Sequence, residues 1–164
     1  MGKEIGFNIA PDEVEKGSIR RWLEPKEFDC PLHYDEEIAK SVGYRGIVAP
    51  WTMVITYGVA PYWKPGDPHT RLRDPPEQVP LPVLDVVPAP CTLSFASDIE
   101  IEFLAPMYVG DRINCTSELT NITYKELKVG KGAFLRQKNT YRNGRSEIIA
   151  VLYITIFRFA PPDE

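Results

Sequence analysis

Polar and apolar residues alternate along the second half of the chain. From Asp98 to Phe103, acidic and apolar residues alternate strictly, which is the period of a half-buried β-strand. Further strands are predicted over 112–121, 132–141 and 146–159. The last is apolar on both faces from Ile148 to Phe157, as in a central strand that is covered on both sides. Asn143-Gly144 predicts a type I′ hairpin turn before it.

The first half carries helix signals instead. Ser18 can cap a short helix, and Asp35 can cap a second one that ends at Gly43. A third helix is predicted to begin at Pro50, a favourable residue in a first turn. Residues 51–59, which follow, carry no charge, and a helix that is apolar all round is a buried helix.

A proline-rich segment, residues 62–91, separates the helices from the strands. Its prolines and its mixed charges exclude a regular core element, and a loop of this length in a small domain is usually a lid, a partner contact or disordered. The pattern as a whole predicts one α+β domain over residues 1–164. We expect a hot-dog arrangement, in which an antiparallel sheet wraps around a central buried helix.

Composition narrows the possible functions. A chain of 164 residues with a net charge of -4 is long enough for one sizeable core and argues against binding to nucleic acid. The three cysteines lack the spacing of metal ligands, so we expect no metal and no cofactor. The sequence contains no apolar run long enough to span a bilayer and no secretion signal, so we expect a cytoplasmic location.

Candidate chemistry gathers in the segment FDCPLH, where Asp29 and His33 stand four residues apart. A carboxylate and an imidazole can act as general acid and base, although a loop histidine more often only stabilises the fold. Four aromatic residues beyond this segment could line an apolar ligand pocket or simply pack in the core. These residues are Trp51, Tyr57, Tyr62 and Trp63.

Several segments, in order, resemble MaoC-like, (R)-specific enoyl-CoA hydratases and 3-hydroxyacyl dehydratases. They are residues 19–21, 31–33, 35–39, 43–50, 101–103, Pro106 and 109–111. In that family a loop reading D-x-N-P-x-H holds the reacting water. A buried helix beginning A-H-G binds the thioester oxygen through the glycine N–H.

The resemblance is incomplete at the loop. Pro31 and His33 match the family motif, whereas Cys30 stands at the asparagine position and Phe28 at the aspartate position. Asp29 is one residue out of register, and a shift of about an ångström can cost on the order of a hundredfold in rate.

The resemblance is also incomplete at the helix start. Ala49 matches the alanine of A-H-G, but Pro50 replaces the histidine and Trp51 replaces the glycine. Proline has no N–H, and the indole of Trp51 occupies the place where the family leaves room for a thioester.

Both changes are typical of the FAS1-like, non-catalytic subunit of heteromeric dehydratases. The resemblance implies a catalytic MaoC-like hot-dog subunit as partner, with this chain forming the tunnel for the acyl chain of a CoA or acyl-carrier-protein thioester, such as a steroid side chain. Two alternatives stay open. One is a self-sufficient homodimeric hydratase that uses His33 and Asp29, and the other is a non-enzymatic acyl-thioester-binding protein.

Overall fold

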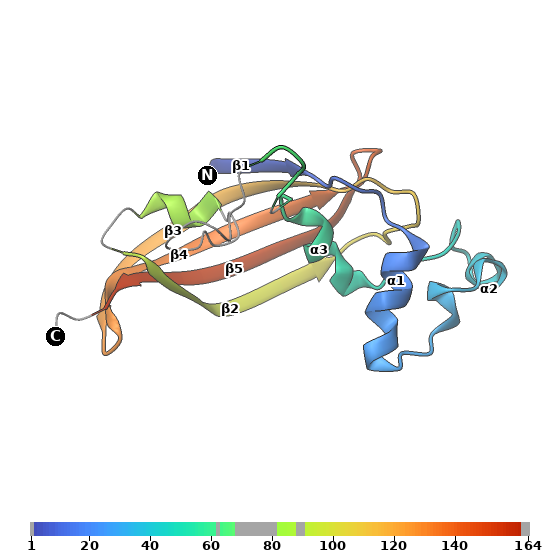
Figure 1. The fold of residues 1–164 in the computed structure, drawn as a ribbon, viewed down its shortest axis with the longest axis horizontal. Helices are drawn as coiled ribbons and strands as arrows, with labels where there is room; N and C mark the ends of the chain where they lie inside the picture. Colours follow the sequence, from blue (N-terminus) through green and yellow to red (C-terminus); the bar gives the residue numbers. More distant parts are fainter. Residues whose placement is uncertain (1, 62, 68–81, 88–90, 162–164) are drawn as a thin grey trace.

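The fold is built on one antiparallel sheet. The computed structural model describes residues 2–61, 63–67, 82–87 and 91–161. Five strands form the sheet in the order β1-β3-β4-β5-β2 (Figure 1). They are β1 (Lys3–Ile9), β2 (Leu93–Phe103), β3 (Asn114–Leu127), β4 (Gly130–Arg142) and β5 (Ile148–Ala160). The predicted α+β class with an antiparallel sheet is confirmed.

The helices lie over one face and at one end of this sheet (Figure 1). The α-helices are α1 (Lys16–Leu23), α2 (Glu36–Ser41) and α3 (Val54–Gly58). Short 3₁₀ turns are η1 (Glu24–Lys26), η2 (Pro31–His33), η3 (Trp51–Met53) and η5 (Pro82–Val86). Within the described segments, no helix is long and apolar enough to cross a membrane.

The second and third predicted helices form where they were expected, whereas the first begins earlier than predicted. The Asp35 carboxylate caps α2 by accepting hydrogen bonds from the N–H groups of Glu37 and Ile38, both at 3.0 Å. Gly43 adopts a positive φ of 98° just after that helix, as a terminator should. The prediction for Ser18 is wrong, because α1 begins two residues earlier, at Lys16, and is not capped by a side chain.

The third helix is where it was predicted, but it is short. A 3₁₀ turn follows Pro50, and α3 then runs for five residues. Its inner side packs on the sheet at Gly58, where a Cβ atom would lie 2.0 Å from Cε1 of Tyr141. Only glycine permits so close an approach between this helix and the sheet.

Two elements of the sheet differ from the sequence prediction. Strand β1 was not predicted, and it is held by antiparallel pairing with β3, more than a hundred residues away. The prediction of a type I′ turn at Asn143-Gly144 is wrong as well. Such a turn needs a positive φ at both residues, whereas the positive φ in this loop is at Ser146 (63°). The buried Asn143 organises a longer loop there by accepting hydrogen bonds from the N–H groups of Arg145 and Glu147.

The proline-rich segment contributes to the core, contrary to the prediction. Within it, Val83 and Leu84 of η5, and Val87 just after it, are buried against Ala133, Leu135 and Ile156 of β4 and β5. The apolar residues of that short stretch cover the sheet beyond α3. Residues 82–87 therefore cover the same sheet face as α3. Residues 68–81 and 88–90, also in this segment, lie outside the described residues.

Candidate functional site

One ring nitrogen of the predicted catalytic histidine is hydrogen-bonded to the backbone. His33 is buried, and its Nδ1 lies 2.7 Å from the carbonyl oxygen of Val48. A carbonyl only accepts hydrogen bonds, so Nδ1 carries the proton and donates it. The ring of Phe28, which stands where the family has its aspartate, lies 5.6 Å from the imidazole. His33 thus ties its loop to the chain just before Pro50.

The structure does not bring Asp29 and His33 into a hydrogen-bonded pair. The Asp29 carboxylate accepts a hydrogen bond from the hydroxyl of Tyr34. This hydrogen bond raises the pKa of Tyr34 above its ordinary value. Among the residues that the structure describes, no hydrogen bond or ion pair joins Asp29 to His33. Whether the two groups act on a bound water stays a prediction.

The start of the third helix offers few donors for an oxygen atom. The N–H of Ala49 already donates to the carbonyl of Met107 at 2.7 Å, and Pro50 has no N–H. The Trp51 ring packs edge-on against Phe103 of β2, with ring centroids 5.6 Å apart. A 3₁₀ turn followed by a five-residue helix aligns few peptide dipoles, so the partial positive charge at this helix start is small.

The aromatic residues predicted to line a substrate tunnel lie in different surroundings. Tyr57 of α3 is buried in the core, and its hydroxyl has no hydrogen-bond partner among the described residues. Trp63 is partly exposed, and its indole N–H donates to the carbonyl of Asp67 at 3.0 Å. Tyr62 lies outside the described residues. Their role in substrate binding stays a prediction.

An inner cavity of about 100 Å³ lies between α3, η5 and the sheet. Its walls are largely apolar and include Ile55 of α3, Pro82 of η5 and Leu152, Ile154 and Ile156 of β5. None of Asp29, His33, Trp51, Tyr57 and Trp63 lines this cavity. The cavity and the altered loop are therefore separate parts of the molecule.

Among the polar residues that line the inner cavity, three neighbours on β3 and β4 are joined by hydrogen bonds. They are Ser117 of β3 and Gln137 and Asn139 of β4, and Ser117 and Gln137 are each only 4% exposed. We call them the Ser117–Gln137–Asn139 cluster. The sequence analysis missed them, although residues 136–140 form a polar run inside a predicted strand. Such a run places polar side chains on both faces of the strand, including the buried one.

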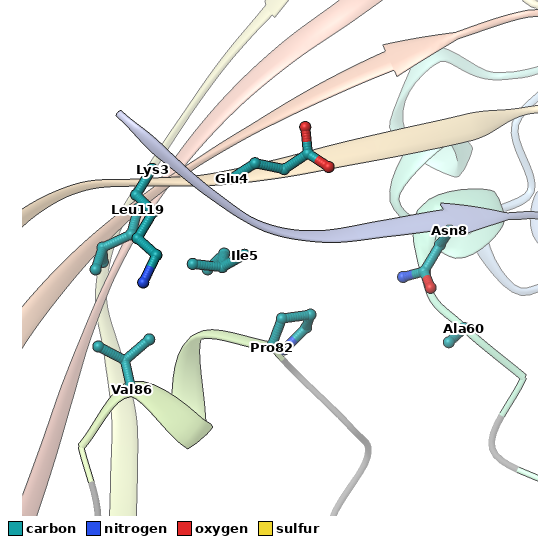
Figure 2. A pocket seen from close by; sticks show the side chains of 8 residues that line it. All are labelled: Lys3, Glu4, Ile5, Asn8, Ala60, Pro82, Val86 and Leu119. Carbon is teal, nitrogen blue, oxygen red and sulfur yellow. The ribbon is translucent and has the colours of Figure 1, made fainter. Parts of the chain in front are cut away.

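An outer cavity of about 670 Å³ adjoins the inner one between β1 and η5 (Figure 2). Ile5, Val86 and Leu119 line it at one end, and Asn8 and Ala60 lie at the end nearest α3 (Figure 2). Asn8, Ala60 and Pro82 line both cavities. The two spaces therefore meet at these residues.

Cys115, which lines the inner cavity, is buried. Burial raises the pKa of the Cys115 thiol to about 11. Its thiol is therefore protonated at neutral pH, and a thiol is a far weaker nucleophile than a thiolate. Burial likewise raises the pKa of Tyr141 beside it. Both groups are neutral parts of the cavity wall.

Comparison with known proteins identifies related sequences. A family model described as FAS1-like, dehydratase domain region, matches residues 1–152. The chain is 28% identical over 163 residues to a probable enoyl-CoA hydratase alpha subunit of Thermomonospora curvata, and the match covers 98% of this chain and 50% of the relative. It is 28% identical over 160 residues to the 3-oxo-4,17-pregnadiene-20-carboxyl-CoA hydratase alpha subunit of Mycobacterium tuberculosis, covering 93% and 47% respectively. The chain spans about half the length of these two relatives.

Among solved structures, the ChsH1-ChsH2 complex from Mycobacterium tuberculosis contains a chain of the same fold. The TM-score is 0.73 at 22% identity, and the match covers 98% of this chain and 86% of that chain. The predicted hot-dog fold is thereby confirmed.

Proposed function

The chain belongs to the FAS1-like dehydratase domain region family, and on that premise we propose that it is a non-catalytic subunit of a heteromeric hydratase. The enzyme would be an enoyl-CoA hydratase or 3-hydroxyacyl-CoA dehydratase. In this proposal the partner supplies the aspartate and the histidine that move protons and water. This chain supplies a cavity for the acyl part of the thioester.

The observation that carries the proposal is the state of the two catalytic positions. His33 donates to the Val48 carbonyl, while Asp29 is bonded to Tyr34. Water addition to an enoyl thioester needs a base, an acid and a donor for the enolate oxygen. Phe28 and Pro50 can supply none of these functions, so both positions favour a supporting role.

The two adjoining cavities support acyl binding. An acyl chain is bound mainly by apolar walls, and such walls form most of the inner cavity. The outer cavity, of about 670 Å³, lies in the range of small-molecule sites. A long or bulky acyl chain that enters from the outer cavity would reach the sheet below α3.

The outer strand β2 supports association with a second subunit. It has strand β5 on one side only, and its residues Leu93, Phe95 and Ile99 are between 42% and 55% exposed. A long outer strand with exposed apolar side chains favours pairing with another chain. The proposed partner is a MaoC-like hot-dog subunit that keeps the D-x-N-P-x-H loop.

Crotonyl-CoA hydration tests the proposal. The chain is purified alone and co-expressed with a MaoC-like chain that keeps D-x-N-P-x-H, and the loss of enoyl absorbance is followed. We expect no hydration by the chain alone, a co-purifying complex, and activity in the complex. His33→Ala in this chain should leave the activity of the complex unchanged, whereas alanine at the partner's motif histidine should abolish it.

Two results would contradict the proposal. Hydration by the chain alone that His33→Ala abolishes would establish the self-sufficient hydratase. Failure to form a complex, with no gain in activity on mixing, would favour a non-enzymatic acyl-thioester-binding protein.

A further inference from the structure

The inward-facing residues of β4 change character in the middle of the strand. Leu135 and Tyr141 are apolar contacts of the two buried clusters, whereas Gln137 and Asn139 between them are polar. Neighbouring positions on β5, Leu152 and Ile154, are apolar. Polar side chains at such positions cost stability unless their hydrogen bonds are made.

Hydrogen bonds join the three side chains of the cluster. Asn139 Oδ1 accepts from Ser117 Oγ at 2.8 Å and from Gln137 Nε2 at 2.5 Å. Gln137 Oε1 is buried and has no partner among the described residues. Because Gln137 is 4% exposed and lines the inner cavity, a group that enters the cavity is the available donor for this oxygen.

The space around Gln137 suits the end of a larger ligand. The inner cavity, about 100 Å³, has room for several atoms and meets the outer cavity at Asn8, Ala60 and Pro82. Its remaining walls are largely apolar, so an apolar chain can run along them. The site therefore combines apolar walls with a single hydrogen-bond acceptor that lacks a donor.

We propose that the Ser117–Gln137–Asn139 cluster recognises a hydroxyl group on an otherwise apolar acyl chain. The hydroxyl donates its proton to Gln137 Oε1, while the chain lies against Leu152 and Ile154. Ser117 and Asn139 hold the Gln137 amide so that its oxygen faces the ligand. This inference rests on the proposed function for the acyl nature of the ligand, and it adds selection for a hydroxylated chain.

A hydroxyl fits this site better than a carbonyl. A ketone or an ester carbonyl only accepts hydrogen bonds, and it would meet Gln137 Oε1 with no proton between the two oxygens. An alkyl chain would leave the same oxygen buried and unpaired. A site built to pair with a hydroxyl discriminates against the analogue that lacks it, because the site then keeps an unsatisfied polar group.

Direct binding of matched ligands tests the inference. Saturated acyl-CoAs of graded chain length are prepared in three forms: unsubstituted, with a terminal hydroxyl, and with a ketone next to the terminal carbon. Their dissociation constants for the full chain are measured by isothermal titration calorimetry. At the chain length that reaches the cluster, we expect the hydroxylated form to bind about three- to tenfold more tightly than the other two.

Two variants locate the effect. Gln137→Met keeps the length of the side chain and removes the acceptor, so the preference for the hydroxylated chain should disappear. Thr140→Val is the matched control, because Thr140 is a buried polar residue of the same strand that points to the opposite sheet face. This control should retain the preference. Thermal melting establishes that each variant is folded.

The outcomes separate this inference from the proposed function. Equal affinities for the three forms at every length would overturn the inference and would mean that Gln137 Oε1 is paired with water. A preference that persists in Gln137→Met would overturn it as well. If Gln137→Met does not fold, the affinities of the three forms for the unmodified chain still decide whether the inference holds. Absence of binding by any form would overturn both the inference and the acyl-binding role, whereas the hydration assay with the partner tests the catalytic role separately.

Discussion

Substitution of Gly58 by alanine tests how closely α3 packs on the sheet. Gly58 is buried at the end of the helix, and a Cβ atom there would lie 2.0 Å from Cε1 and 2.8 Å from Cδ1 of Tyr141. Contacts this short do not occur between real atoms, so either the helix or the ring must move. Tyr141 is only 3% exposed, so its ring is enclosed within the core.

Two opposing terms set the size of the effect. Replacing a helical glycine by alanine stabilises a protein by about 0.5–1 kcal/mol when the site has room. Overpacking a core costs about 1–3 kcal/mol. We therefore expect Gly58→Ala to lower the free energy of unfolding by roughly 1–2 kcal/mol, the difference between these terms.

Urea denaturation followed by tryptophan fluorescence measures this change. With a slope of about 1–3 kcal/mol per molar urea, the midpoint should fall by roughly 0.3–2 M. Gly17→Ala is the matched control, since Gly17 lies in α1 and a Cβ atom added there would have no neighbouring atom within 4 Å. That control should raise the midpoint. Both are measured at one protein concentration, because association also stabilises a fold.

A Gly58→Ala protein as stable as the unmodified chain would refute this account of the packing. A double variant sharpens the test. Tyr141→Leu removes the ring that the added methyl group meets, so alanine at Gly58 should cost less in that background. Equal costs in both backgrounds would mean that the effect does not pass through Tyr141.

Two further predictions concern a helix cap and a buried thiol. Asp35→Ala removes the acceptor for two N–H groups of α2, so chemical denaturation should show a loss of about 0.5–2 kcal/mol, and Asp35→Asn should lose much less. Burial raises the pKa of Cys115 from 9.0 to about 11, so the unfolded chain releases this proton first, and stability should fall as the pH rises from about 9 to about 11. This fall should be smaller in Cys115→Ala, and at neutral pH Ellman's reagent should label Cys115 more slowly than the half-buried Cys30 and Cys91.

Local signals were enough to predict much of this fold. The alternation from Asp98 to Phe103 lies within β2, and Asp35 caps α2 as its position before two glutamates predicted. The apolar run after Pro50 forms the third helix, although it is shorter than expected. These features depend on residues a few positions apart, which is why the sequence alone carries them.

The departures from the family motif could also be recognised in the sequence. Phe28, Pro50 and Trp51 are substitutions of residue type, and a side chain without an acid, a base or an N–H lacks that chemistry in any fold. The hydrogen-bond partners of Asp29 and His33 were decided by tertiary contacts. Tyr34 bonds to Asp29, and the carbonyl of Val48, fifteen residues further along the chain, accepts from His33.

The inner cavity depended on the tertiary structure altogether. Strand β1 exists because β3 offers it a pairing edge, and η5 is buried because the apolar face of β4 and β5 lies beneath it. Neither cause can be read from neighbouring residues. The same holds for Gln137, whose type is plain in the sequence but whose burial beside an unfilled space follows from how helix, 3₁₀ turn and sheet meet. Residue type sets which chemistry a position can perform, and long-range packing sets whether that position faces solvent, core or ligand.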